Sequence, residues 1–120
     1  GQCLIPRLSI QPLVENSVKY SLCKMENGML VIRIKISGAR LTVCVEDNGP
    51  GFAPEEREAL EMEFKHEFYM HDRHVGLTNL NQRLKLIYGA DAGLAIKEHD
   101  GLTGIEFSVP TEGDAYDSNK

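Results

Sequence analysis

Four stretches of the chain alternate apolar and polar residues, a pattern typical of β-strands with one buried face. The first runs from Leu30 to Ile36, and Ser37-Gly38-Ala39-Arg40 turns the chain into the second, which ends at Asp47. These two stretches are predicted to form an antiparallel hairpin. The expected inward-facing residues are Leu30, Ile32, Ile34 and Ile36; Leu41, Val43, Val45 and Asp47; Leu94 and Ile96; and Thr103, Ile105, Phe107 and Val109.

Two other stretches repeat apolar residues at helical spacing. The first covers about Ser9 to Leu22, with Ser9 as the expected N-cap and Pro12 in the first turn, where proline is tolerated. The second ends at Tyr88-Gly89, where glycine suits the position just past a helix. The apolar positions are Ile10, Leu13, Val14, Val18 and Leu22 in the first helix, and Leu77, Leu80, Leu84 and Ile87 in the second.

The remaining segments lack a strong pattern. Residues 52–75 have a helix-like start but weak periodicity and many polar side chains, which favours a mobile lid or binding loop over a core element. Residues 111–120 carry few hydrophobic side chains and are expected to be a disordered tail. Residues 1–110 are therefore expected to form one domain, in the order helix, strand, strand, lid, helix, strand, strand.

Composition narrows the class of protein. A chain of 120 residues has room for one domain with a modest core. The net charge of −5, without a Lys/Arg stripe, argues against nucleic-acid binding. No stretch is long and apolar enough to span a membrane, and no secretory signal is visible. The three cysteines are widely spaced and odd in number, which fits a reduced cytosolic setting better than a disulfide framework.

Asp47 is an acid where the strand pattern calls for a hydrophobe. A carboxylate on an inward-facing row is costly unless it is hydrogen-bonded. The chain then turns through Asn48-Gly49-Pro50-Gly51, where two glycines allow close approach of a neighbour. These features predict an acid at the floor of a pocket, ready to accept a ligand's donor. The alternative is a strand end followed by an ordinary turn.

The first helix carries polar residues at the shoulder of its apolar stripe. Asn16 lies about 60° round from Leu13, and Tyr20 shares that shoulder with Lys19 further out. A half-buried amide oxygen suits Mg²⁺, which takes few protein ligands, and a nearby lysine can supply charge to phosphates. The alternative is a helix rim with an amide and a solvated lysine.

Two other features could belong to a ligand site. Gly76 precedes the second helix, whose N-terminus offers backbone donors and a positive dipole end to a phosphate. Thr78, Asn79 and Arg83 could extend this site or simply cap and solvate the helix. Thr103 has the parity of an inward-facing residue and could help to read a flat polar ligand, or could satisfy its own backbone.

The order and spacing of these motifs resemble a known family. Residues 8–20 resemble the N box of the ATP-binding domain shared by gyrase, the large heat-shock chaperones, histidine kinases and MutL (the GHKL superfamily). Residues 45–52 match its G1 box, residues 75–84 resemble its G2 box, and residues 102–110 look like its closing strand. The sequence Gln-Pro-Leu-Val-Glu-Asn at residues 11–16 is similar to that of the LytS/YesM-type sensor histidine kinases in particular.

The resemblance implies the Bergerat fold, an α/β (α+β) two-layer sandwich. Its mixed, mostly antiparallel sheet is covered on one face by helices, and ATP lies under a lid at about residues 52–75. Asp47 would accept the adenine amino group, helped by Thr103 through water, and Asn16 would hold Mg²⁺. The residues that the resemblance assigns to ATP are Asn16, Lys19, Tyr20, Asp47, Gly49, Gly51, Phe52, Gly76, Leu77, Thr78, Asn79 and Thr103.

Two positions depart from the family's pattern. The G2 box usually begins Gly-x-Gly-Leu, and His74 stands at its first position, where a side chain could change the phosphate contacts. The ATP hydrolases of the superfamily carry a glutamate where this chain has Pro12, so no base stands in the usual place. Glu15 is a weak substitute, because it projects about 100° away from Asn16. A kinase, whose nucleophile is a histidine on another domain, fits better than an ATPase.

The resemblance implies partners outside this chain. The acceptor histidine would lie on a dimerisation domain, because none of the four histidines sits on a convincing amphipathic helix. A response regulator would act downstream, and the full-length protein would be a homodimeric, membrane-anchored bacterial receptor with this domain in the cytoplasm, out of contact with the membrane. The rival interpretations are a GHKL ATPase, an anti-sigma-factor kinase and a non-catalytic binding module. A zinc site from His66, His71 and His74 is a weaker hypothesis, since histidines in a polar segment are usually solvated.

Overall fold

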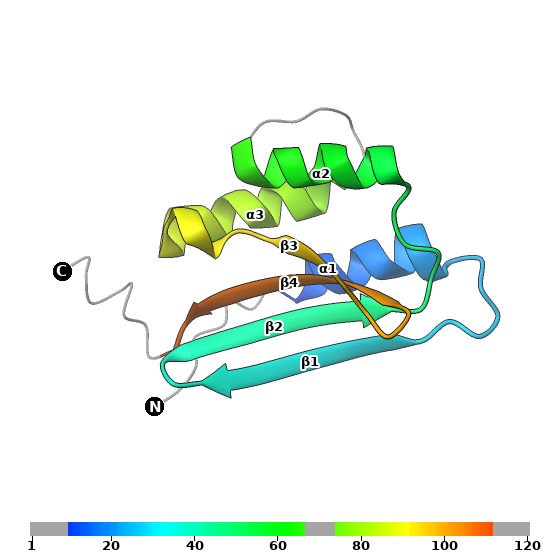
Figure 1. Ribbon diagram of the computed structural model, residues 1–120, viewed down its shortest axis with the longest axis horizontal. Helices are drawn as coiled ribbons and strands as arrows, with labels where there is room; N and C mark the ends of the chain where they lie inside the picture. The colour runs from blue at the N-terminus through cyan, green and yellow to red at the C-terminus, as the bar shows by residue number, and fades with distance from the viewer. Residues whose placement is uncertain (1–9, 67–73, 112–120) are drawn as a thin grey trace.

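The structure is a computed structural model that describes residues 10–66 and 74–111. Its sheet has four strands in the order β1-β2-β4-β3, with helices on one side (Figure 1). The strands are β1 (Leu30–Ser37), β2 (Arg40–Asp47), β3 (Ala95–His99) and β4 (Leu102–Pro110). Each pairing is antiparallel, so the described part of the sheet lacks the expected mixed component. The two-layer α/β architecture is confirmed.

The predicted hairpin of β1 and β2 is present, and β3 and β4 form a second one. Gly38 turns β1 into β2 with a φ of 60°. Asp100 and Gly101 join β3 to β4 with φ values of 51° and 79°, the two positive angles that a tight hairpin turn requires. The N–H of Thr111 donates to the carbonyl oxygen of Ala39 at 2.8 Å, so the first residue of the expected tail is fixed to the β1–β2 turn. Residues 112–120 lie outside the described residues.

The first helix differs in detail from the prediction. It consists of α1 (Gln11–Ser17) followed by one π-helical segment, η1 (Val18–Leu22). Val18, expected to face the core, is 49% exposed, and Ser17 is buried instead. A π-turn holds more residues than an α-turn, which rotates the helix and changes the face that each later side chain presents. Ser9, the expected cap, lies outside the described residues, and Ile10 occupies the N-cap position.

The segment expected as a lid contains a packed helix. Helix α2 (Pro54–His66) has Leu60 fully buried and Phe64 buried with it in the core. The prediction that residues 52–75 contain no core element was therefore wrong for α2. Glu63, which lies between Leu60 and Phe64 in the sequence, is also buried. This charged residue interrupts the apolar pattern of the helix. Residues 67–73 are outside the described part, so a lid there stays a prediction.

The second predicted helix is confirmed as α3 (Val75–Tyr88). Leu77, Leu80 and Leu84 are buried, whereas Ile87 is exposed. Gly89 ends the helix with a φ of 108° and donates its N–H to the carbonyl oxygen of Lys85 at 2.9 Å. A short 3₁₀ helix, η2 (Ala90–Ala92), leads into β3. None of the helices within the described ranges has both the length and the apolar character needed to cross a bilayer.

The core lies between the helices and the three strands β2, β4 and β3. It includes Leu13, Val43, Leu60, Leu80 and Phe107. The prediction that β1 has one buried face was wrong, because Ile34 is 53% exposed although its register partner is the buried Val43. Strand β1 is the edge strand next to β2, and α1 packs over β2. The apolar row of β1 therefore faces the helix side without helix cover from the described residues.

Candidate functional site

Asp47 ends strand β2 with its side chain buried, at 5% exposure. Ser21 Oγ donates to Asp47 Oδ1 at 2.8 Å, and the N–H of Gly49 donates to the same oxygen at 2.9 Å. No basic side chain pairs with Asp47 among the residues that the structure describes, and Oδ2 has no protein donor there. The acid is therefore oriented by one oxygen and keeps the other as an acceptor for a ligand.

Asp47 and Thr103 are register partners on β2 and β4, so they lie side by side at the floor of one small cavity. This cavity has about 30 Å³ of free space. Its walls come from the first helix, the segment after β2, and the first turns of α2 and α3. It is lined by Asn16, Ser17, Tyr20, Ser21, Val45, Asp47, Gly51, Phe52, Glu56, His74, Thr103 and Ile105.

A second hollow of about 270 Å³ lies beside the cavity, between the first helix and the start of α3. It is lined by Pro12, Glu15, Asn16, Lys19, Tyr20, His74, Val75, Gly76 and Leu77. Three residues, Asn16, Tyr20 and His74, line both spaces and form the boundary between them. We call the first space the cavity and the second the groove.

His74 connects three elements at this boundary. Its Nδ1 lies 2.6 Å from Asn16 Oδ1, and its Nε2 lies 2.9 Å from Glu56 Oε2. These two contacts hold the ring between the amide of Asn16 and the carboxylate of Glu56. The rings of Tyr20 and Phe52 lie 4.3 Å and 5.6 Å from the His74 ring. His74 is 2% exposed and fills the middle of the site.

The other predicted ligand residues lie at different places around the two spaces. Asn16, Tyr20, Gly51 and Phe52 join Asp47 and Thr103 in the cavity lining. Lys19 is exposed at the groove, with its Nζ 5.3 Å from the centre of the Tyr20 ring.

Glu15 also borders the groove but is exposed, and its Oε2 accepts a hydrogen bond of 2.9 Å from Gln11 Nε2. This placement gives Glu15 no contact with the cavity floor, in agreement with its expected projection away from Asn16.

The expected phosphate cradle at residues 76–79 is only partly formed. The N–H groups of Leu77 and Thr78 donate to the carbonyl oxygen of His74 at 3.0 Å and 3.1 Å, so they are used within the chain. The Thr78 hydroxyl donates to the Val75 carbonyl oxygen at 3.1 Å, and Asn79 is exposed outside the groove lining. The first-turn N–H of Gly76 is the donor that best fits a ligand in the groove.

The glycines after β2 allow close packing, as expected. A Cβ at Gly49 would lie 2.3 Å from Ser21 Oγ. Gly51 has a φ of 77°, and a Cβ there would lie 3.0 Å from Thr103 Oγ1. The neighbours that require these glycines are therefore side chains of the cavity itself.

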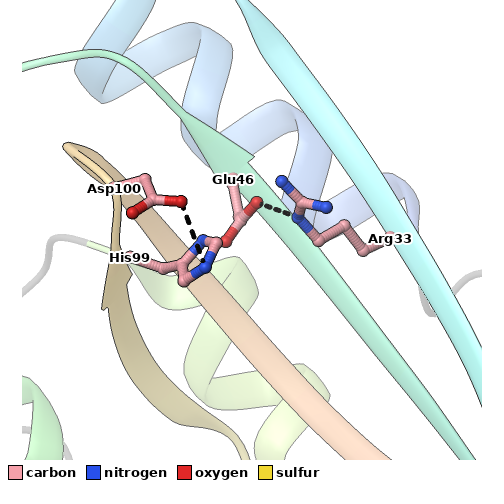
Figure 2. Close-up of polar contacts among 4 residues, drawn as sticks. All are labelled: Arg33, Glu46, His99 and Asp100. Carbon is pink, nitrogen blue, oxygen red and sulfur yellow. Dashed lines mark hydrogen bonds and ion pairs between the residues drawn. The ribbon is translucent and has the colours of Figure 1, made fainter.

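The opposite face of the sheet is organised differently. Figure 2 shows Arg33 and Glu46 on neighbouring strands, where Arg33 Nε donates to the buried Glu46 carboxylate at 2.5 Å. This hydrogen bond raises the pKa of Arg33 above its ordinary value. His99 pairs with Asp100 at 3.3 Å, and both side chains are exposed. The Glu46 carboxylate is therefore already paired with a guanidinium, whereas Asp47 has no basic partner among the described residues.

Sequence reasoning missed three polar residues of the cavity: Ser17, Ser21 and Glu56. Ser21 is five residues after Asn16, so a regular α-helix would place it about 140° away, on another face. The π-turn brings both to the cavity. Glu56 lies in the segment expected to be a lid, and a glutamate in the first turn of a helix indicates only a favourable interaction with the helix dipole.

Asn16 Oδ1 is the described oxygen best placed for a metal, because it is half-buried and lines the groove. One neutral amide oxygen fits Mg²⁺, which fills its other positions with water and phosphate oxygens. Within residues 10–66 and 74–111 there is no cluster of three or more His, Cys, Asp or Glu side chains that could hold a metal. The weaker zinc hypothesis involved His71, which lies outside these ranges.

Comparison with known proteins identifies relatives along nearly the whole chain. Residues 5–113 match the family described as histidine kinase-, DNA gyrase B-, and HSP90-like ATPase. The chain is 36% identical over 112 residues to the sensor histidine kinase YpdA of Escherichia coli (strain K12), covering 92% of this chain and 18% of the relative. It is 37% identical over 111 residues to the sensor histidine kinase YesM of Bacillus subtilis (strain 168), covering 90% and 17%.

The chain therefore spans less than a fifth of the length of these curated relatives. Among solved structures, the nucleotide-free catalytic domain of the histidine kinase ThkA aligns with a TM-score of 0.64. The alignment covers 89% of this chain and 65% of that chain at 17% identity. At this identity the similarity establishes a common fold.

Proposed function

Since the chain belongs to the family of histidine kinase-, DNA gyrase B- and HSP90-like ATPases, we propose that it is the Mg-ATP-binding catalytic domain of a sensor histidine kinase. Two of its relatives are sensor histidine kinases of which it spans one part. The domain would donate the γ-phosphoryl group of ATP to a histidine on a dimerisation domain outside this chain.

The observation that carries the proposal is the state of Asp47. Its Oδ1 is held by Ser21 and Gly49, and its Oδ2 remains an acceptor within a small, partly enclosed cavity next to Thr103. Adenine presents an exocyclic amino donor on a flat apolar ring, and a charge-assisted hydrogen bond in a cavity shielded from water is strong. The side chains of Val45 and Ile105 in the lining would contact the ring.

The residues around the groove would orient the phosphates. Asn16 would hold Mg²⁺, Lys19 would add positive charge, and the N–H of Gly76 would donate at the positive end of α3. When bound, Mg²⁺ neutralises charge on the phosphate oxygens during transfer. Pro12 occupies the place of the hydrolases' glutamate, and Glu15 is turned to Gln11, so the chain lacks a base at that place. A domain that only binds and orients ATP for an external histidine has no need of one.

The remaining partners follow from this assignment. The dimerisation and phosphoacceptor domain would belong to the same polypeptide, and the full-length protein would be a homodimer that signals to a response regulator. The domain would lie in the cytoplasm, in a receptor anchored to the membrane by other segments. The names of the relatives support a sensory role.

Substitution of Asp47 tests the proposal. In Asp47→Asn the amide oxygen keeps the bonds from Ser21 and Gly49, and an NH₂ group replaces Oδ2 and opposes the adenine amino group. We expect a loss of about 1–3 kcal/mol in Mg-ATP binding, roughly tenfold or more in affinity, by isothermal titration calorimetry. The melting temperature should change little. Asp91→Asn, at an exposed position, is the matched control. Equal affinities in the wild type and Asp47→Asn would contradict the proposal.

A second candidate is a binding module that does not turn over ATP. It is favoured by one observation, the occupation of the site centre by His74, which holds Asn16 and leaves little free space. A thermal shift with Mg-ATP distinguishes the candidates in part, because a module that has lost nucleotide binding would show none. Phosphorylation of the full-length protein by labelled ATP then distinguishes a kinase from a module that binds ATP without turnover.

A further inference from the structure

His74 fills the space that a nucleotide would have to pass through. Its ring lines both the cavity and the groove, and the rings of Tyr20 and Phe52 flank it. The free space left in the cavity is about 30 Å³, against about 270 Å³ in the groove. A purine base is several times larger than the space in the cavity, so it cannot enter while the imidazole stays in this position.

His74 also uses the groups that a metal-bound triphosphate would need. Its Nδ1 holds Asn16 Oδ1, and its main-chain carbonyl oxygen accepts the N–H groups of Leu77 and Thr78 at the start of α3. Glu56 holds the other side of the ring through Nε2. The imidazole thus stands where a cation would stand, between an amide oxygen and a carboxylate.

The backbone at His74 is suited to movement. With φ of 61° and ψ of 30°, it is in the left-handed region, which is strained for residues other than glycine. The strain persists because the surrounding side chains hold the ring. Release of the ring would remove those restraints at the first residue before α3.

We propose that His74 is a self-occluding latch, closed by Asn16 and Glu56, and that Mg-ATP binds only when its imidazole leaves the boundary between cavity and groove. This inference rests on the proposed function. It assigns to His74 and Glu56 the control of access to the site, whereas the binding residues would contact Mg-ATP itself. The latch lowers the apparent affinity in proportion to the fraction of molecules that are open.

Two variants open the latch in different ways. His74→Gly removes the ring and suits the left-handed backbone. Glu56→Gln keeps the shape of the outer anchor and removes its charge, and its partly exposed position in α2 makes unfolding of this variant a small concern. His99→Ala removes an exposed histidine that lines neither the cavity nor the groove, and it serves as the control.

Calorimetric titration with Mg-ATP is the first measurement. We expect His74→Gly to bind about tenfold or more tightly than the wild type, with Glu56→Gln between them and His99→Ala unchanged. Without nucleotide, His74→Gly should melt at a lower temperature, because the closed latch joins the first helix to α2 and α3. A gain in affinity together with a loss of stability is the expected signature, since a merely structural residue would lower both.

The position of the ring supplies a readout independent of affinity. In ¹H–¹³C NMR spectra the Cε1–H signal of His74, identified by its loss in His74→Gly, should move on addition of Mg-ATP as the ring leaves Tyr20. The His99 signal should stay in place. A His74 signal unmoved at saturating Mg-ATP would overturn the latch.

The outcomes separate the two proposals. Equal or weaker Mg-ATP binding by both variants, with binding by the wild type intact, would overturn the latch and leave the nucleotide site standing. Absence of binding by the wild type and both variants would remove the nucleotide site and the latch with it. Should His74→Gly fail to fold, Glu56→Gln decides by the same comparison.

Discussion

The hydroxyl of Ser21 donates to Oδ1 of Asp47 at 2.8 Å, across 26 residues of sequence. This bond connects the π-helical end of the first helix to the end of β2. It leaves the second carboxylate oxygen without a protein donor among the described residues, so Ser21 helps to determine which oxygen a ligand meets. Ser21 is therefore a positioning residue for the proposed adenine contact.

Removal of the Ser21 hydroxyl should weaken binding without abolishing it. In Ser21→Ala, Asp47 keeps the N–H of Gly49 and loses its other donor. We expect a loss of about 0.5–1.5 kcal/mol, roughly two- to tenfold in Mg-ATP affinity by calorimetry. Ser37→Ala, at the exposed end of β1, should leave the affinity unchanged. An unchanged affinity in Ser21→Ala would show that Asp47 is held by the backbone alone.

A side chain at Gly49 should destabilise the fold by steric conflict. The Cβ of Gly49→Ala would lie 2.3 Å from Ser21 Oγ, so we expect a loss of about 1–3 kcal/mol in the free energy of unfolding, measured with urea. In the double variant with Ser21→Ala part of the loss should be recovered. Gly76→Ala is the control, because its Cβ meets nothing within 4 Å and alanine favours a helix. Additive effects of the two substitutions would contradict the proposed conflict.

Asn81 should be the polar side chain on α3 most important for stability. It is fully buried, with Nδ2 donating to the Phe64 carbonyl oxygen at 3.0 Å and Oδ1 accepting the Leu94 N–H at 2.8 Å. Asn81→Ala leaves both backbone groups without that partner, and we expect a loss of about 2–4 kcal/mol in urea unfolding. Arg83→Ala, exposed on the same helix, should cost much less. Similar losses for the two would exclude this role.

Cys44 and Cys23 should differ in reactivity. Burial raises the pKa of the Cys44 thiol from 9.0 to about 11, with a further contribution from Glu46, whereas Cys23 is exposed. Iodoacetamide at pH 8 should therefore label Cys23 in the native protein and reach Cys44 only after unfolding, as measured by peptide mass spectrometry. Rapid native labelling of Cys44 would contradict its placement on β2.

The raised pKa of the Cys44 thiol also predicts that the stability of the protein depends on pH. Because the folded protein holds the thiol proton more tightly, the contribution of Cys44 is complete below pH 9 and is lost as the pH rises toward about 11. Urea midpoints should fall over this interval. In Cys44→Ala the fall should be smaller, since other groups alone remain to titrate. Parallel curves for both proteins would refute the assignment.

The strands and α3 could be predicted from sequence because their burial follows a simple period. Val43 and Val45 on β2 alternate with outward residues, and Leu77, Leu80 and Leu84 repeat at helical spacing. Asp47 was identified because it breaks such a period. The residue pattern of a strand does not show whether the strand lies at the edge of its sheet. Ile34 on β1 was therefore expected to be buried, whereas the structure places it at the surface.

The site was predictable only in part, for reasons of tertiary contact. Helix α2 was not predicted as a core helix because Glu63 interrupts its apolar residues. Ser21 was not predicted because the π-turn changes the face of the helix on which it lies. His74 was identified as a departure from the family's glycine, but its contacts with Asn16 and Glu56 depend on elements 58 and 18 residues away. Single-sequence patterns describe neighbours along a helix or strand and carry no information on such distant pairs.

The pairing of β2 with β4 places Asp47 opposite Thr103, with a spacing fixed by the backbone ladder. The residues that close the site, among them His74 and Glu56, come instead from helix starts. In the proposed function, selectivity for the adenine ring and access to the site therefore depend on separate parts of the molecule. Sequence changes at the helix starts can retune how readily the protein loads its ligand while the identity of that ligand stays the same.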